Sequence, residues 1–223
     1  MRIVSLVPSI TETLSAWDCT PIACTRFCER DDLAHVGGTK NPDLERIVAL
    51  SPDLVVVEEE ENRREDYDAL LDRGLEVLAL HVRSLGDVNV AMAQLAHRVG
   101  ATWDDIEVAP QLAHRAGAFI PIWRRPWMAL GTPTYGADLL IHLGISTIYD
   151  EQPYPSVELD DVRARHPDVV LAPSEPYPFK ERHRAELESL APTSYVDGKD
   201  LFWWGERTRG ARVRLADQLS AVV

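Results

Sequence analysis

The chain has 223 residues, 45% of them hydrophobic and 26% charged, and its formal net charge is −13. This length fits one large domain or two small lobes. The acidic charge argues against nucleic acid and anionic membranes as partners, although acidic surfaces also serve solubility. No apolar run approaches the roughly 18 residues that a membrane-spanning helix needs.

The N-terminus predicts a buried strand and not an export signal. Met1 and Arg2 lead directly into IVSLV, without a basic segment, a long apolar stretch or a small-residue cleavage site. We therefore expect a cytoplasmic location for the sequence as written. A trimmed chain with a restored methionine would look the same, so a periplasmic or membrane-anchored protein is the alternative.

Short apolar, β-branched runs predict strands at 3–7, 54–57, 76–80, 127–130 and 168–172. Helical patterns lie between them at 9–17, 43–50 and 64–73. In the first helix, Ser9 and Glu12 have the spacing of a capping box. The alternation of strands and helices predicts a mainly parallel sheet covered by helices.

A block of sequence occurs twice. Residues 44–60 read LERIVALSPDLVVVEEE, and residues 159–175, which lie 115 positions later (159 minus 44), read LDDVRARHPDVVLAPSE. Each copy predicts a short helix, a Pro-Asp break, an apolar strand and a polar loop. The repeat predicts two similar α/β lobes with a cleft between them.

The segment between the two copies predicts helices only. Leu85, Val88, Met92, Leu95 and Val99 form one apolar stripe at helical spacing. Thr102 and Asp105 could cap a second helix, and no strand is expected from 84 to about 118. We expect an N-terminal lobe at 1–83, a helical connector at 84–120 and a C-terminal lobe at 121–223. The tail predicts a helix at about 206–221 with Val213, Leu215 and Leu219 as its apolar residues.

Ligands of open parallel sheets bind beyond the carboxyl ends of the strands, so the loops there supply the candidate ligand-binding residues. These candidates are Ser9, Phe27, Cys28, Lys40, Glu60, Asn62, Tyr135, Glu175, Tyr177, Trp203 and Trp204. The Phe202-Trp203-Trp204 loop either covers the core or lines a pocket for a flat apolar ligand, and the sequence favours neither.

No metal site and no catalytic set are expected. Cys19, Cys24 and Cys28 lack a standard zinc or iron–sulfur spacing, and buried thiols are the favoured interpretation. The acidic run Glu58–Glu61 is more typical of a solvated helix entry than of a cation site. The chain has no nucleophile elbow and no phosphate-binding loop.

The opening RIVSLVPSITETL, the segment VGGTKNPDLERIVALSPDLVVVEEEENRREDYDALLDRGLEVLAL and the later YPSVELDDVRARHPDVVLAPSEPYP resemble a known family. They are similar to the cobalamin- and siderophore-binding proteins of ABC importers, the helical-backbone (class III) substrate-binding proteins. The resemblance covers the chain from residue 2 to about 220. It implies an α/β fold of two similar Rossmann-like lobes joined by a long rigid backbone helix, with the ligand in the cleft between the lobes.

The resemblance also implies function. It implies a monomeric binding protein and not an enzyme, with a corrinoid or iron chelate as bound ligand and no covalent cofactor. Trp203, Trp204 and Tyr135 match regions that face the ligand, while Glu45 and Glu158 are candidates for docking to an ABC permease. Both glutamates also fit as favourable acids at helix N-termini. The alternative function is a cytoplasmic enzyme or a ligand-handling or sensing protein using the same cleft, with Cys28 and Lys40 among its reactive groups.

Overall fold

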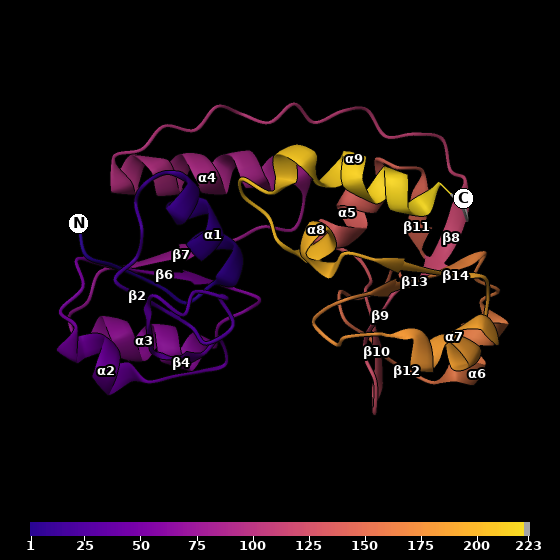
Figure 1. Ribbon diagram of the computed structural model, residues 1–223, viewed down its shortest axis with the longest axis horizontal. Helices are drawn as coiled ribbons and strands as arrows, with labels where there is room; N and C mark the ends of the chain where they lie inside the picture. Colours follow the sequence, from indigo (N-terminus) through magenta and orange to yellow (C-terminus); the bar gives the residue numbers. More distant parts are fainter. Residues whose placement is uncertain (221–223) are drawn as a thin grey trace. The chain divides into compact units, whose positions relative to one another are not determined.

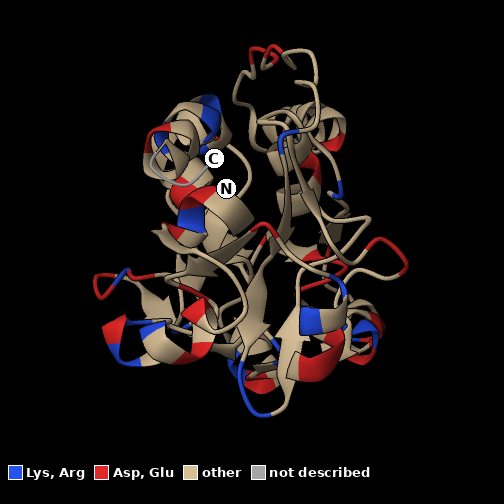
Figure 2. Cartoon of the chain, turned by 90° about the vertical axis from the view of Figure 1, so that its right-hand side faces the viewer, with Lys and Arg blue, Asp and Glu red and all other residues tan. Residues whose placement is uncertain are grey.

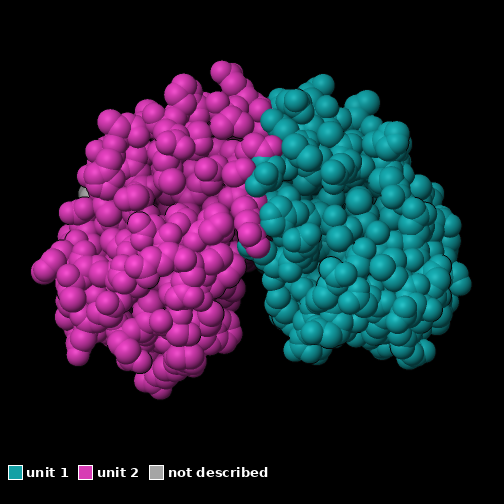
Figure 3. Space-filling view, turned by 180° about the vertical axis from the view of Figure 1, so that it is seen from behind, with its two compact units in different colours: residues 1–82, 87–105, 204–207 teal, residues 83–86, 106–203, 208–223 magenta. Residues whose placement is uncertain are grey.

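The computed structural model describes residues 1–220 and divides the chain into two compact units (Figures 1 and 3). Unit 1 comprises 1–82, 87–105 and 204–207, and unit 2 comprises 83–86, 106–203 and the described part of 208–223. Each unit has its own parallel sheet, so the expected α/β class is confirmed. The role of 84–120 as a connector domain stays a prediction. No helix among the described residues is long and apolar enough to cross a membrane.

The sheet of unit 1 has five parallel strands in the order β3-β2-β1-β6-β7. Its strands are β1 (Ile3–Ser5), β2 (Ala23–Cys24), β3 (Ala34–His35), β6 (Leu54–Glu58) and β7 (Val77–Leu80). The three strands expected in this region are confirmed. The sequence did not reveal β2 and β3, because two residues are too few to show a pattern. A small hairpin of β4 (Gly37–Gly38) and β5 (Asn41–Pro42) follows β3.

The helices of unit 1 are α1 (Pro8–Ala16), α2 (Leu44–Ala49), α3 (Arg64–Asp72) and most of α4 (Leu85–Val99). The expected capping box in α1 is wrong. Pro8 begins the helix, Val7 is its N-cap without a side-chain cap, and Ser9 lies inside the first turn. Proline is favoured there because the first helical N–H groups have no partner within the helix.

Four of the five residues in the predicted apolar stripe of α4 are buried, and the fifth, Val99, is half-buried. Leu85, Val88, Met92 and Leu95 are at most 5% exposed. A core cluster of unit 1 lies on the sheet and its helices, and its buried members are Val4, Leu6, Ala23, Val36, Ile47, Val55, Val57 and Leu70. The hydrophobic face of each element therefore fixes which side of it meets the sheet.

Unit 2 has a parallel sheet in the order β11-β8-β13-β14 and a separate antiparallel sheet in the order β12-β10-β9. The first contains β8 (Ala116–Phe119), β11 (Ile145–Thr147), β13 (Val169–Pro173) and β14 (Thr193–Val196). The second contains β9 (Pro121–Trp123), β10 (Trp127–Ala129) and β12 (Ser156–Val157). Two expectations are corrected: the strand found at 127–129 belongs to the antiparallel sheet, and β8 begins at 116, inside a segment expected to hold no strand.

The helices of unit 2 are α5 (Tyr135–Ile141), α6 (Leu159–Ala164), the short η1 (Glu181–His183), α7 (Arg184–Glu188), α8 (Gly198–Phe202) and α9 (Thr208–Leu219). In α9, Leu215 and Leu219 are buried, but Val213 is 60% exposed, so its expected core position is wrong.

The second connector helix, expected from Thr102, is absent. Residues 101–115 run without helix or strand (Figure 1). Pro110 cannot donate a helical hydrogen bond. Val108 and Leu112 are 41% and 48% exposed, so no apolar face is buried that would stabilise a helix here.

The repeated block folds in the same way twice. Helix α2 and strand β6 begin at 44 and 54, and α6 and β13 begin at 159 and 169, again 115 positions later. Ser51 and His166 are also equivalent by this shift, and both have a left-handed φ, of 46° and 49°. The repeat therefore specifies a turn geometry as well as element types.

In each copy of the repeat, the aspartate of the Pro-Asp break hydrogen-bonds to the neighbouring strand. Asp53 Oδ2 accepts a hydrogen bond from Arg2 N at 2.6 Å, and Asp168 Oδ2 accepts one from Gly117 N at 2.7 Å. In return, Asp53 N donates to Arg2 O and Asp168 N donates to Gly117 O, both at 2.8 Å. Each carboxylate thus holds the start of β6 or β13 beside the strand that precedes it in the sheet.

Replacing either aspartate by asparagine should weaken its unit, because a charge-assisted bond to a backbone N–H becomes a neutral one. We expect Asp53→Asn and Asp168→Asn each to lower the free energy of unfolding by about 1 kcal/mol. Urea unfolding followed by circular dichroism measures the effect. Asp72→Asn, an exposed carboxylate at the end of α3, is the control. Equal midpoints for all four proteins would contradict the proposed role.

Candidate functional site

The candidate residues of unit 1 gather in the loops at the carboxyl edge of its sheet. Ser9 follows β1, Phe27 and Cys28 follow β2, and Lys40 lies in the turn between β4 and β5 after β3. Glu60 and Asn62 follow β6. Because all five strands are parallel, their carboxyl ends lie at one edge, as the sequence argument assumed.

Asn62 ties three of these loops together. Its Oδ1 accepts a hydrogen bond from Glu58 N at 2.9 Å, and its Nδ2 donates to Leu6 O at 3.3 Å and Thr39 O at 2.9 Å. The side chain is 7% exposed. With these bonds in place, Asn62 positions the loops and offers little of its own surface.

Lys40 is exposed and bound to the same loop. Its Nζ donates to Glu60 O at 2.5 Å, while Glu60 N donates to Glu58 Oε2 at 2.8 Å. His81, at the end of β7, pairs through Nδ1 with Glu59 Oε2 at 2.8 Å. The acidic run is therefore an organised turn held by its own backbone, by Lys40 and by His81.

Glu58 is the unusual member of this run, since it is only 2% exposed. Its Oε2 accepts N–H groups of Glu60 and Glu61, both at 2.8 Å, whereas its Oε1 is buried without a hydrogen-bond partner among the described residues. Burial raises the pKa of Glu58 to about 7, against the lowering effect of the two N–H groups. The acidic run was predicted to be solvated, so the burial of this carboxyl was not expected from the sequence.

Phe27 and Cys28 are neighbours with opposite exposure. Phe27 is 50% exposed, and the guanidinium of Arg26 lies 4.8 Å from its ring centroid. Cys28 is 6% exposed; its Sγ accepts a hydrogen bond from the Thr11 hydroxyl at 3.2 Å and shares another with the Thr25 hydroxyl at 3.2 Å. Ser9 is buried, and its Oγ has no partner among the described residues.

In unit 2, Tyr177 belongs to an aromatic cluster on the loop after β13. Its ring meets Phe179 at 4.8 Å, and it meets Trp123 edge-on at 5.7 Å between centroids. Phe179 stacks on Trp127 at 6.0 Å. Trp123, which is 44% exposed, was not among the candidates because the hairpin of β9 and β10 was not expected from the sequence. The sequence signal that could have indicated this hairpin is the pair of tryptophans on either side of Arg-Arg-Pro.

The other candidates of unit 2 differ in accessibility. Tyr135 is 4% exposed, and its hydroxyl lies 3.1 Å from Thr208 Oγ1, with its pKa raised by burial. Trp203 is half-buried, with the Lys199 ammonium 4.9 Å from its ring centroid. Glu175 is also half-buried and packs against Gly198, where any side chain would collide with it. Trp204, which belongs to unit 1, is 4% exposed.

The two docking candidates are exposed on repeat helices. Glu45 lies in the first turn of α2 and pairs with Arg73 at 3.0 Å, while Glu158 is the N-cap of α6. They are not equivalent by the repeat, since the counterpart of Glu158 is Asp43. Acidic residues are spread over many helices and loops (Figure 2). Among the described residues, no group of three or more His, Cys, Asp or Glu could hold a metal ion.

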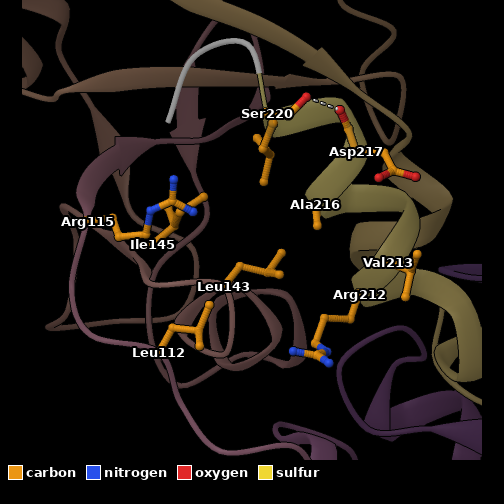
Figure 4. Close-up of a pocket in the computed structure, with 10 residues that line it drawn as sticks. Leu112, Arg115, Leu143, Ile145, Arg212, Val213, Ala216, Asp217 and Ser220 are labelled. Carbon is orange, nitrogen blue, oxygen red and sulfur yellow. Dashed lines mark hydrogen bonds between the residues drawn. The ribbon is translucent and has the colours of Figure 1, made fainter.

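A cavity of about 410 Å³ lies elsewhere in unit 2 (Figure 4). Its walls combine two arginines, Arg115 and Arg212, with apolar side chains that include Leu112, Leu143 and Val213. Helix α9 forms one side of it. None of the candidate ligand-binding residues lines this cavity.

Sequence comparison identifies the family. A family model described as "Periplasmic binding protein" matches residues 3–118, more than half of the chain. The chain therefore belongs to the periplasmic binding protein family, a family of binding proteins.

Curated relatives match across most of the chain. The vitamin B12-binding protein of Salmonella paratyphi A is 25% identical over 189 residues, covering 76% of this chain and 71% of the relative. The vitamin B12-binding protein of Pectobacterium carotovorum is 24% identical over 204 residues, covering 78% and 72%.

Solved structures share the fold. The periplasmic vitamin B12 binding protein BtuF of Vibrio cholerae has a TM-score of 0.79 at 17% identity, covering 99% of this chain and 97% of its own. The periplasmic heme-binding protein BhuT, in complex with two hemes, has the same TM-score and identity, covering 99% and 98%. The expected helical-backbone binding-protein fold is thereby confirmed.

The expected cytoplasmic location is wrong. The family model is described as "Periplasmic binding protein", and the structural relatives BtuF and BhuT are named as periplasmic, which points to the periplasm. The expectation depended on the residues at the start of the sequence, and these belong to the buried strand β1 of the folded unit. A strand that builds the sheet carries no information about export.

The buried Glu58 predicts a pH-dependent stability. Between the ordinary glutamate pKa and about 7, the folded chain holds a proton that the unfolded chain has lost, so stability falls as pH rises through this window. At about 1.4 kcal/mol per pKa unit, the loss is at most about 3.5 kcal/mol. Glu58→Gln should remove this loss, so its stability relative to the native chain should increase as the pH rises.

Urea unfolding between about pH 5 and about pH 8 measures this difference. Glu107→Gln, which changes an exposed carboxylate, is the control and should follow the native chain at every pH. A constant difference between Glu58→Gln and the native chain over the whole range would contradict the raised pKa.

Proposed function

We propose that the chain captures a corrinoid, or a related metal chelate with a flat conjugated ring, for uptake by an ABC importer. The observation that carries the proposal is the match to vitamin B12-binding proteins over about three quarters of the chain. The structural neighbours named as heme-binding proteins support the wider class, because corrin and heme are both large ring chelates.

The exposed aromatic residues support the same ligand class. We assign direct ligand contact to Phe27, Tyr177 and Trp203, whose rings keep accessible surface at the carboxyl edges of their sheets. A flat ring ligand gains contact area and stacking energy from such side chains. Lys40, Glu60 and Glu175 are candidates for the polar groups of the ligand.

The buried candidates have a supporting function in this proposal. Ser9, Cys28, Asn62, Tyr135 and Trp204 are each less than 9% exposed and hold the loops that present the accessible residues. We further propose that the protein acts as a monomer, binds its ligand non-covalently and catalyses no reaction. A permease of the importer is then its macromolecular partner.

Cyanocobalamin titrated into the purified chain should bind in the micromolar range or tighter, as followed by calorimetry and by the absorbance of the corrin ring. Phe27→Ala and Trp203→Ala should each weaken binding about five- to tenfold, because each removes an aromatic contact of about 1 kcal/mol. Phe27 is 50% exposed, so the thermal midpoint of free Phe27→Ala should change little.

Val90→Ala, which truncates a 60% exposed apolar side chain on α4, is the matched control and should bind as the native chain does. Hemin and an iron–siderophore complex complete the ligand panel. If no member of the panel changes the absorbance or raises the thermal midpoint, the proposed function is wrong. If the two aromatic variants bind with native affinity, the ligand class stands and the assigned contacts are wrong.

Glu45 and Glu158 are proposed to dock to basic side chains of the permease. Replacing both by glutamine should weaken binding of the chain to its permease in detergent by about tenfold, with ligand affinity unchanged. Asp72→Asn is the control for a lost exposed carboxylate. If the affinity for the permease does not decrease, the two residues are not docking residues and only stabilise the N-termini of their helices.

A further inference from the structure

The cavity beside α9 is separate from the candidate site for the ring ligand. It lies at the amino ends of β8 and β11, because Arg115 directly precedes β8 and Ile145 begins β11. Glu175 and Tyr177 follow the carboxyl end of β13, at the opposite edge of the same parallel sheet. An occupant of this cavity therefore does not compete with a ligand bound at the carboxyl edge.

The segment that ends at Arg115 forms one wall of the cavity. It belongs to the run 101–115, which has neither helix nor strand, and runs of this length are uncommon in compact domains unless they have a function such as binding. Two contacts hold the segment. The buried His142 donates from Nδ1 to Ala109 O, and Arg115 N donates to Gly144 O at 2.7 Å. The wall is thus fixed against the end of α5 and the start of β11.

Gly144 also positions the side chain of Arg115. Gly144 has a φ of 78°, and a Cβ there would lie 2.6 Å from Ala113 O and 3.0 Å from both Cγ and Cδ of Arg115. The aliphatic stem of Arg115 therefore packs on a position that suits glycine and no larger residue. This contact places the stem of an exposed arginine against the wall of the cavity.

Helix α9 forms the opposite wall and supplies a second cation. Arg212 is half-buried, and its side chain extends from α9 toward the side of the cavity where Leu112 and Leu143 lie (Figure 4). Asp217 is the one carboxylate among the described lining residues, and Figure 4 shows it directed away from both arginines. The lining is therefore cationic, in a chain whose formal net charge is −13.

The rest of the lining is mainly apolar. Leu143 and Ile145 are buried, whereas Leu112 and Val213 are exposed. Two exposed apolar side chains at one cavity leave apolar area in contact with water, and an apolar occupant would remove that area from water. The volume of about 410 Å³ lies in the range of roughly 300–1,000 Å³ that is typical of small-molecule sites.

We propose that this cavity binds an aliphatic monocarboxylic acid of medium chain length. The guanidinium of Arg212 forms a bidentate, charge-assisted pair with the carboxylate, and the half-buried position of Arg212 limits screening of this pair by solvent. The more exposed Arg115 attracts the acid through a weaker, salt-screened interaction. The alkyl chain covers Leu112 and Val213. An inorganic anion would leave these walls in water, and a fatty alcohol would lack the ion pair.

Hexanoate, octanoate and decanoate, each kept below its micelle-forming concentration, are titrated into the full chain by calorimetry. We expect saturable binding, with the affinity rising about three- to fourfold for each methylene that the cavity covers. Decanol should bind at least about tenfold more weakly than decanoate, and sulfate should not bind. Methyl NMR signals of Leu112, Leu143 and Val213 should shift with decanoate, and those of Val90, on α4, should not.

Variants test the two halves of the site. Arg212→Gln should weaken decanoate binding about tenfold or more, and Arg115→Gln about two- to threefold. Val213→Ala, which truncates an exposed side chain, should weaken it about threefold and leave the thermal midpoint of the free protein unchanged. Arg163→Gln on α6 and Val90→Ala on α4 are the matched controls outside the cavity and should bind decanoate as the native chain does.

This site does not depend on the proposed corrinoid function. Arg212→Gln should keep the native affinity for cyanocobalamin, and Phe27→Ala should keep the native affinity for decanoate. Circular dichroism confirms that each variant is folded. The proposal is overturned if no acid of the series binds, if the affinity does not depend on chain length, or if either Arg212→Gln or Val213→Ala binds decanoate with native affinity.

Discussion

The parallel alignment of strands within each unit is the constraint on which the candidate site depends. Parallel neighbours require crossover connections, so every strand of a sheet ends at the same edge, and the loops that follow are brought together whatever their distance in sequence. In unit 1 this brings the loops after β1, β3 and β6 to one edge, and the side-chain amide of Asn62 hydrogen-bonds to all three.

That edge combines groups with different physical tasks. Phe27 offers ring surface to solvent, while Glu58 and Cys28 are buried and held by backbone or hydroxyl donors. Burial raises the pKa of both ionisable groups, but their net pKa shifts are opposite. At Glu58 desolvation outweighs the hydrogen bonds and raises the pKa, whereas at Cys28 the hydrogen bonds outweigh desolvation and lower it.

The duplicated block shows how similar lobes acquire different surfaces. Asp53 and Asp168 fasten their strands through the same pair of backbone bonds, so the framework is shared. The loops that follow differ, because one buries Glu58 under an acidic turn and the other carries Tyr177 into an aromatic cluster. The two units therefore share a common scaffold and have two chemically distinct edges.

The sequence by itself determined the α/β class, the repeat with its helix and strand positions, and the loops that hold the candidate residues. Apolar periodicity and the Pro-Asp break are local signals, and they sufficed for β6, α4 and β13. Only the tertiary structure decided the antiparallel sheet of β9, β10 and β12 and the burial of Glu58. Those features depend on which side chains surround a residue in the folded chain. The local sequence of a charge run or a short strand is the same whether it faces water or the core.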